Sequence, residues 1–363
     1  MRLTHLRLQN FRNHKKFEHA FSNNLTILVG PNASGKTNLL EAIRFLSFSK
    51  SFRARKDLDL ISWGENFVRV KGEIEKESDK TDLEVVIDTA KKTKSCKVIK
   101  INGQICKVSD LIGKLVTVFF APEDLNLITL APSVRRKYLD MVVAQLDKGY
   151  YRDLLELRQV LLNRNKLLFE IRERRAKPSE LDFWNRQLIT LAKKIFQKRM
   201  YLLNFYNSRL SGIFNQIVGK DEKLKIEYLP CPSFLKKAEN IEEIFSKELE
   251  KQQEEEIKRC RSLIGPHRDD FLLELSGKNL AFFGSRGEAR SAILALKLCE
   301  LLFLKKKLFD RPILLLDDIF SELDVLHRVQ VARVVKDQQT ILTTTEFESI
   351  PKELVGQAEV LEL

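Results

Sequence analysis

Short apolar runs mark the first third of the chain. They are rich in Val, Ile, Leu, Thr and Phe and are separated by polar segments, a pattern typical of β-strands. One amphipathic stretch, 36–48, has the spacing of a helix instead. The predicted strands lie at 3–8, 25–29, 67–74, 83–88, 97–101 and 116–120.

Beyond Pro132 the apolar positions follow a helical spacing that continues for roughly 85 residues. Apolar pairs at 154/155, 161/162 and 168/169 recur every seven residues. Trp184, Leu188, Leu191, Ile195 and Leu202 follow a spacing of three or four with one turn skipped. Only the segment 176–179, which contains Pro178, interrupts the pattern. The sequence therefore predicts a helical hairpin.

The last third of the chain returns to alternating strands and helices. A polar helix over 244–260 is followed by predicted strands at 270–275 and 280–283 and by a helix over 288–304. A buried strand at 313–316 and a final strand at 340–344 come next. We therefore expect an α/β fold with an inserted helical part and no internal repeat.

Composition limits the class of protein. The 363 residues are 44% hydrophobic and contain only 14 glycines, which excludes a low-complexity or collagen-like chain and suggests about two domains. No apolar run reaches the roughly 18 residues that a membrane helix needs, and the first residues do not resemble a signal peptide. The five cysteines form no CxxC pattern, so we expect free thiols in a cytoplasmic protein.

The chain is basic, with a formal net charge of +13. Residues 151–210 hold 14 Lys and Arg residues against six Asp and Glu residues, so much of this excess lies on the predicted hairpin. Such a charge fits nucleic acid, an acidic membrane surface or an acidic partner, and it also fits solubility alone. At this stage the hairpin is either a DNA-facing arm or a well-solvated helical surface.

The segment NLTILVGPNASGKTNLLEAIRFL contains the pattern Gly30-x4-Gly35-Lys36-Thr37 between a predicted strand and a predicted helix. This is the context that a phosphate-binding P-loop requires. Glycines let backbone amides turn toward a phosphate at the helix N-terminus, while Lys36 reaches the β- and γ-phosphates and the Thr37 hydroxyl can bind Mg²⁺. The loop residues between the glycines are also candidate nucleotide contacts: Pro31, Asn32, Ala33 and Ser34.

A second acidic element follows the buried strand at 313–316. Asp317 lies at the carboxyl end of that strand, where open α/β sheets bind their ligands, and is the expected second Mg²⁺ ligand. Asp318 is a candidate catalytic group that orients or deprotonates the attacking water, together with Lys36. No Asn-Lys-x-Asp motif for guanine is present, so ATP is the expected nucleotide.

Three further segments resemble ABC-type ATPases. The sequence FGSRGEAR, before the helix predicted at 288–304, resembles their signature loop, with Ser285 and Gly287 at the matching positions and Glu288 in place of Gln. The sequence SELD at 321–324 resembles their D-loop. The residues 343–346 end the next strand, where the switch residue of that family lies.

Motifs along nearly the whole chain resemble the RecF family of recombination mediators, within the SMC-like ATPases. The interval between Lys36 and Asp317 is far shorter than in long-armed SMC proteins, which also favours RecF. The resemblance implies an ABC-type P-loop ATPase head, 1–132 and 261–363, with an inserted helical arm domain, 133–260. The motifs are LRLQNFRNH, SFRARKDLDLI, FFAPEDLNLI, RRKYLD, LLNRNKLL, GPHRDD and LLLDDIFSELD.

The same resemblance implies a function. It predicts a slow ATPase that acts as a dimerisation switch, with each γ-phosphate held between Lys36 of one chain and Ser285 of the other. Arg12 and Asn32 are candidate nucleotide contacts. The expected ligands are ATP, Mg²⁺ and double-stranded or gapped DNA, and the expected partners are a second copy, RecR and RecO. The biology implied is loading of the RecA recombinase at single-strand gaps, DNA replication and repair, and the SOS response.

Alternatives remain at several points. A nucleotide-binding subunit of an ABC transporter is the rival from another class, and a P-loop kinase is a weaker one because it leaves the signature-like loop and SELD without a role. The motif GPHRDD at 265–270 marks either a site near the dimer interface or a structural turn. Glu288 and Ala289 depart from the Gln-rich family signature, and Thr129 and Leu130 lie where the family usually has a glycine.

Overall fold

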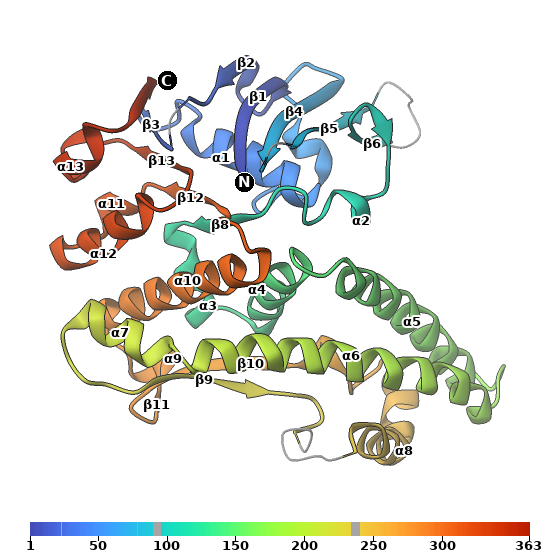
Figure 1. The fold of residues 1–363 in the computed structure, drawn as a ribbon. Coiled ribbons are helices and arrows are strands. Elements are labelled where there is room, and N and C mark those ends of the chain that lie inside the picture. The colour runs from blue at the N-terminus through green and yellow to red at the C-terminus, as the bar shows by residue number, and fades with distance from the viewer. Residues whose placement is uncertain (23, 78, 90–95, 234–239) are drawn as a thin grey trace. The chain divides into compact units, whose positions relative to one another are not determined.

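Internal contacts divide the chain into two units, neither of which is one continuous stretch of sequence (Figure 1). The computed structural model describes residues 1–22, 24–77, 79–89, 96–233 and 240–363. The predicted boundaries of the head and arm domains stay a prediction. Contacts group residues 261–296, which lie in the predicted head, with the second unit. The first unit is Met1–Asp124, Ile217–Gly219 and Lys297–Leu363; the second unit is Leu125–Gln216 and Lys220–Leu296.

A five-stranded parallel sheet lies in the first unit and has the order β14-β3-β13-β12-β8. Every residue of β12 and β13 is buried, which explains why both strands are continuous apolar or small-residue runs rather than alternating ones. The strands predicted around 25, 116, 313 and 340 are confirmed. Their bounds are β3 Leu25–Val29, β8 Thr117–Phe120, β12 Ile313–Asp317, β13 Thr340–Thr344 and β14 Glu359–Glu362.

An antiparallel sheet of six strands completes the first unit, in the order β2-β1-β4-β5-β6-β7. Sequence reasoning missed β2, because HKKFEHA is mostly polar and none of its residues is buried. The other predicted strands of this region are confirmed. The bounds are β1 Arg2–Phe11, β2 His14–Ala20, β4 Phe67–Lys76, β5 Asp79–Asp88, β6 Cys96–Ile101 and β7 Gln104–Ile105.

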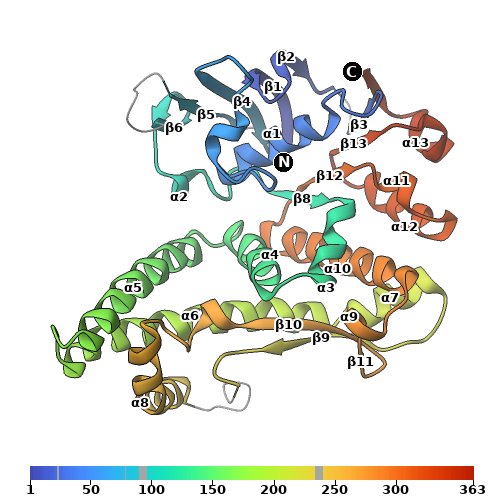
Figure 2. The ribbon, with the colours of Figure 1, turned by 180° about the vertical axis from the view of Figure 1, so that it is seen from behind.

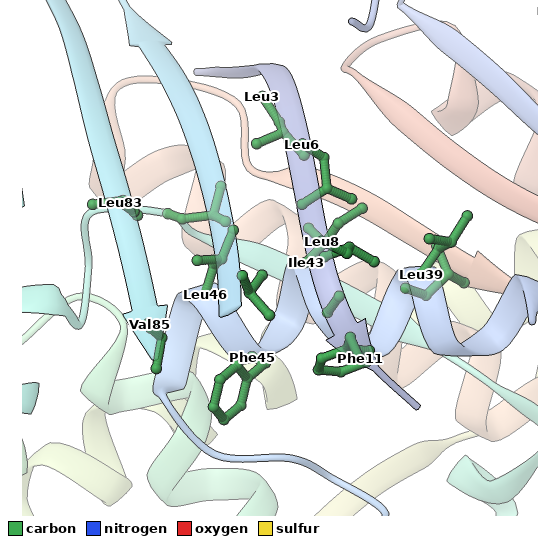
Figure 3. Packing of buried hydrophobic residues seen from close by; sticks show 14 of the residues in the cluster. Leu3, Leu6, Leu8, Phe11, Leu39, Ile43, Phe45, Leu46, Leu83 and Val85 are labelled. Atoms are coloured by element: carbon green, nitrogen blue, oxygen red, sulfur yellow. The ribbon is translucent and has the colours of Figure 1, made fainter. Parts of the chain in front are cut away.

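The helix α1, Lys36–Phe48, packs its apolar side chains against the inner face of the antiparallel sheet. Figure 3 shows these side chains from α1 meeting those of β1 and β5. The same hydrophobic cluster includes residues of β8, β12 and β13, so α1 lies in a core shared by both sheets. The side chains labelled in the figure are Leu3, Leu6, Leu8, Phe11, Leu39, Ile43, Phe45, Leu46, Leu83 and Val85.

The second unit contains the predicted helical hairpin. Helices α5, Lys148–Arg172, and α6, Leu181–Asn207, run side by side (Figure 2). In each apolar pair of α5 the second residue is exposed, so the row Leu155, Leu162 and Phe169 faces outward. The other helices are α3 Asn126–Thr129, α4 Pro132–Ala144, α7 Leu210–Val218 and α8 Ile241–Arg259, and the sheet β11-β10-β9 comprises β9 Leu224–Leu229, β10 Asp270–Leu275 and β11 Lys278–Asn279.

The strand predicted at 280–283 is wrong, because these residues form the short helix α9, Leu280–Phe283. The Asn279 side chain accepts a hydrogen bond of 2.9 Å from the Ala281 N–H and caps that helix. A short apolar run does not distinguish strand from helix by its pattern alone. The remaining helices are α2 Val108–Leu111, α10 Arg286–Leu308, α11 Ile319–Glu322, α12 Val325–Val335 and α13 Lys352–Val355.

A buried arginine joins the elements of the second unit. The guanidinium of Arg199 on α6 donates to Asp140 on α4 at 2.9 Å and to Asp269, before β10, at 2.8 Å. Tyr150 of α5 donates to Asp140, and Tyr228 of β9 donates to Asp269. Arg199 and Asp269 are only 1% and 2% exposed, so each charge depends on the other for compensation.

Among the described residues, no helix combines the length and apolar character needed to cross a membrane.

Replacing Arg199 tests this cluster. Arg199→Met leaves the buried Asp269 and the partly buried Asp140 without their cation, and we expect a loss of about 3–5 kcal/mol in the free energy of unfolding. Urea unfolding followed by circular dichroism measures the loss. The matched control is Arg172→Met, because Arg172 is exposed and pairs with Glu173 at 3.1 Å; its expected cost is about 0–1 kcal/mol. Equal effects of the two variants would contradict the account.

Candidate nucleotide site

The P-loop connects β3 to α1, as the sequence predicts. Gly35 has φ 112°, and a Cβ there would lie 2.5 Å from His14 Nε2 and 2.6 Å from Asn13 Nδ2. A Cβ on Gly30 would lie 2.5 Å from the Leu363 backbone oxygen. Only glycine therefore fits at these two positions of the loop.

Lys36 closes the loop on itself. Its ammonium group donates to the Gly30 carbonyl at 2.7 Å and to the Pro31 carbonyl at 2.8 Å, and the side chain is 7% exposed. Asn32 and Ala33 are exposed at the tip of the loop, and Ser34 is half-buried. The lysine is thus held at the loop by two neutral acceptors that a phosphate can replace with charge-assisted hydrogen bonds.

Asp317 brings together the ends of three parallel strands. Its Oδ1 accepts a hydrogen bond of 2.7 Å from the Thr37 hydroxyl, at the start of α1 after β3. The same oxygen accepts 2.8 Å from the Thr343 hydroxyl of β13. The predicted partners Thr37 and Asp317, which are 280 positions apart in sequence, therefore lie in direct contact.

Burial changes the acidity of this carboxylate. Asp317 is 6% exposed, and burial raises the pKa of its carboxyl above the usual range, while the hydrogen bonds from Thr37 and Thr343 lower it. The charge of Glu123 also raises this pKa, and that of Arg53 lowers it. Asp317 thus occupies a low-dielectric site in which a cation would strongly stabilise its ionised form.

Thr37 and Asp317 fit a magnesium ion. Their two oxygens are 2.7 Å apart, close to the roughly 2.9 Å between adjacent ligands of an octahedral Mg²⁺ ion. Among the described residues, no group of three or more His, Cys, Asp or Glu side chains could hold a metal. Magnesium needs no such group, because it is commonly held by one or two protein oxygens, by waters and by the phosphates of its nucleotide.

Asp318 follows in a left-handed conformation, with φ 49°, at the residue directly before α11; its side chain does not cap that helix. Its backbone N–H donates to the Thr343 hydroxyl at 2.9 Å, so Thr343 contacts both acidic residues. Ser321, in the segment that resembles a D-loop, donates to the Asp318 carbonyl at 2.7 Å. One hydrogen-bond network therefore connects the acidic pair to β13 and to α11.

Arg12 is bound to the protein itself. Its Nε and Nη2 donate to both carboxylate oxygens of Glu41 at 3.0 and 2.9 Å, and Nη1 donates to the Asp59 carbonyl at 2.7 Å. Glu41 is fully buried on α1 and also accepts from the Ser51 hydroxyl. The predicted nucleotide contact by Arg12 stays a prediction, and what the structure adds is that Arg12 supports the helix that follows the P-loop.

Sequence reasoning missed the turn between β1 and β2 as a support for the P-loop. The Asn13 amide donates to the Ser34 carbonyl at 2.9 Å, and His14 Nε2 donates to the Gly35 carbonyl at 3.1 Å. Burial lowers the pKa of His14, which favours the neutral ring. The motif LRLQNFRNH contains both residues but does not show what they contact, and the glycine at position 35 leaves room for both side chains.

The segment that resembles a signature loop forms a helix cap in the second unit. The Ser285 hydroxyl accepts a hydrogen bond of 3.2 Å from the Glu288 N–H, and the Glu288 carboxylate accepts one of 2.7 Å from the Ser285 N–H. This reciprocal pair is a capping box at the start of α10. Glu288, which departs from the family's usual Gln, thereby fixes an exposed turn that contains Ser285 and Gly287.

The contacts of GPHRDD favour the structural interpretation of that motif. Asp269 belongs to the buried cluster around Arg199, and Asp270 accepts two hydrogen bonds from Arg135 at 2.6 and 2.8 Å. Burial lowers the pKa of His267 to about 4, so its ring is neutral at physiological pH. A Cβ on Gly265, which has φ 134°, would lie 3.0 Å from His267 Nδ1, so the turn is tightly folded.

Known proteins resemble this chain along almost its whole length. A family model described as the RecF/RecN/SMC N terminal domain matches residues 2–355. The DNA replication and repair protein RecF of Geobacillus sp. (strain WCH70) is 38% identical over 99% of this chain and 96% of its own length. The protein of the same name from Bacillus thuringiensis (strain Al Hakam) is 36% identical over 99% and 96%.

Solved structures give the same answer for the fold. The recombination mediator protein RecF-ATP in the RecFOR pathway is similar with a TM-score of 0.89 and 33% identity, over 96% of this chain and 93% of that one. An Smc head bound to the C-winged helix domain of ScpA has a TM-score of 0.56, 17% identity and coverage of 99% and 93%; this shows the fold alone. The expected ABC-type ATPase fold is confirmed.

The pKa of Asp317 generates a prediction about pH. Protonated Asp317 is a poor Mg²⁺ ligand. The pKa of an ordinary Asp is about 3.9, and because the pKa of Asp317 is raised, its carboxylate becomes protonated at a higher pH. We expect the Mg²⁺-dependent gain in nucleotide affinity to fall as the pH falls through this raised value. In the metal-free protein the sign is opposite: the folded state keeps this proton longer than the unfolded state, so the contribution of Asp317 to stability falls as the pH rises.

Mg²⁺ titrations with a fluorescent nucleotide at several pH values measure this dependence. Glu123→Gln removes a charge that raises the Asp317 pKa, so its midpoint should move to lower pH. Asp317→Asn should remove both the Mg²⁺ effect and its pH dependence. An Asn variant that still responds to Mg²⁺ like the wild type would exclude Asp317 as the ligand.

Proposed function

The chain belongs to the RecF family of DNA replication and repair proteins, and on that premise we propose that it is an ATP-dependent DNA-binding repair protein that dimerises on ATP. The observation that carries the proposal is the contact of Thr37 and Thr343 with one oxygen of Asp317, at the carboxyl ends of parallel strands. This is where an open α/β sheet binds a nucleotide.

ATP and Mg²⁺ fit this arrangement. The P-loop amides and the start of α1 receive the phosphates, Lys36 exchanges its two carbonyl partners for phosphate oxygens, and Thr37 and Asp317 hold the metal. When bound, Mg²⁺ supplies positive charge that offsets the charge of the transferring phosphate. Asp318 is the proposed group that orients the attacking water, and the exposed Asn32 and the nearby Arg12 are secondary candidates for contacts with ATP.

Hydrolysis is proposed to act as a switch rather than as a source of product. In this proposal the capped turn at Ser285 and Gly287 of one copy binds the γ-phosphate held by Lys36 of the other copy. ATP then favours the closed pair because it contacts both copies only in that state, and hydrolysis removes the contact. Slow turnover fits such a role, since the closed state must persist while it is bound to DNA.

DNA is the proposed macromolecular ligand, at duplexes and at the edges of single-strand gaps. The positive net charge of +13 supports phosphate contacts that do not depend on base sequence. Similar solved proteins are described as recombination mediators in the RecFOR pathway. We therefore propose RecO and RecR as partners, recombinase loading onto single-stranded DNA as the outcome, cytoplasmic action, and a contribution to the SOS response.

A nucleotide-binding subunit of an ABC transporter is not favoured. Relatives that cover 99% of this chain carry the name of a DNA replication and repair protein.

Light scattering tests the ATP-dependent dimer. With Mg²⁺ and ATP, we expect the mass to rise from that of one chain, 42.2 kDa, toward twice that value, and to stay low with ADP. Ser285→Arg should still bind ATP but remain at the mass of one chain, because the arginine fills the turn that meets the partner's nucleotide. Ser179→Arg, at an exposed position between α5 and α6, is the matched control. Normal dimerisation of Ser285→Arg would exclude the proposed interface.

A further inference from the structure

A basic groove lies on the antiparallel sheet of the first unit. It has a volume of about 360 Å³. Its lining residues lie on three adjacent strands: near the start of β2, on β1 and on β4. Five of the seven lining residues are Lys or Arg, and none is acidic. The lining residues are Arg7, Leu8, Gln9, Lys15, Lys16, Arg69 and Lys71.

Strand register brings these cations close together. Gln9 of β1 pairs with Lys16 of β2 on one side and with Arg69 of β4 on the other, and Arg7 pairs with Lys71. Adjacent strands are about 4.8 Å apart, and residues two positions apart along a strand are separated by about 6.7 Å. The groove is therefore a compact grid of positive charge, although its residues come from distant parts of the sequence.

The existing partners of these cations are weak competitors for an anion. Lys71 pairs with Asp82 at 2.9 Å and Arg7 pairs with Glu18, and both of these pairs are solvent-accessible. Arg69 is exposed but pairs at 2.6 Å with Glu84, which is buried. Exposed ion pairs contribute only about 0–1 kcal/mol, so a phosphate can take over Arg7 and Lys71 at little cost. Lys15 and Lys16 are exposed and form no ion pair with any other described residue.

The helical hairpin uses two of its cations inside the protein. Arg164 and Arg199 are buried and pair with acidic residues that lie outside 151–210 in sequence. The formal charge of residues 151–210 therefore overstates the positive charge that the hairpin offers to DNA by these two arginines.

The lining also restricts the class of ligand. Its single apolar residue, Leu8, is fully buried, and it contains no aromatic side chain. Protein partners usually need apolar or aromatic anchors, and single-stranded bases need aromatic rings for stacking. Cations without such anchors fit the phosphates of a nucleic-acid backbone.

We propose that this groove, lined by Arg7, Lys15, Lys16, Arg69 and Lys71, binds the phosphodiester backbone of DNA independently of base sequence. The inference rests on the proposed function and adds to it a DNA-contact surface on the first unit, outside the helical hairpin. The groove also adjoins the nucleotide site along the chain, since the turn residues Asn13 and His14 that hold the P-loop directly precede Lys15 and Lys16. DNA in the groove would therefore lie on the strand that supports the P-loop.

Charge reversal tests the groove. The affinity of a fluorescent gapped duplex is measured with ATP over a range of salt concentrations for the wild type and for Lys15→Glu/Lys16→Glu. Loss of two phosphate contacts should lower the steepness of log K against log salt by about 1.8 and weaken binding about tenfold or more at moderate salt. The control Lys251→Glu/Lys258→Glu makes the same change in net charge on exposed positions of α8 and should retain the wild-type slope. Arg69→Gln, a milder change, should lower the slope by about 0.9.

The outcomes separate the two proposals. A wild type that does not bind DNA with ATP would overturn the proposed function. A wild type that binds, with Lys15→Glu/Lys16→Glu folded by circular dichroism and unchanged in slope, would overturn the groove alone.

Discussion

A single carboxylate oxygen connects the nucleotide site to the strands around it. Asp317 Oδ1 accepts hydrogen bonds from Thr37, which starts the P-loop helix, and from Thr343, which lies on the neighbouring strand. Thr343 in turn accepts from the Asp318 N–H. A metal bound to this oxygen would change its hydrogen bonds to both hydroxyls, and through Thr343 and Asp318 this change would reach β13 and α11.

Buried and partly buried ion pairs connect the elements of the second unit. In the second unit, the family motifs RRKYLD and GPHRDD meet through the ion pair of Arg135 with Asp270. Arg199 pairs with one Asp of each of these motifs, Asp140 and Asp269. In the motif LLNRNKLL, Arg164 pairs with the buried Glu256 of α8. Helix α10 begins at the capped turn of Ser285 in the second unit, and from Lys297 onward its residues belong to the first unit. The turn that is proposed to meet the partner's nucleotide therefore stands at the start of a helix that continues into the first unit.

Sequence patterns identified most of this arrangement because its strongest signals are local. The P-loop, the buried strand that ends at Asp317 and the helical hairpin each follow from glycine spacing or hydrophobic periodicity. The strand predicted at 280–283 failed because a short apolar run fits either element, and its helix depends on a cap from Asn279. The support of the P-loop by Asn13 and His14 depends on how β1 pairs with β2, and so does the basic groove. The polar sequence of β2 does not show this pairing.

The central claim is that the nucleotide state of this site controls DNA binding. The most direct measurement is the affinity for a gapped duplex with ATP and with ADP, for the wild type, for Lys36→Met and for Lys50→Met, whose lysine is exposed just beyond α1. The account predicts tight binding with ATP and weak binding with ADP for the wild type and the Lys50 control, and weak binding in both nucleotides for Lys36→Met. Equal affinity in ATP and ADP, or an unaffected Lys36→Met, would contradict it.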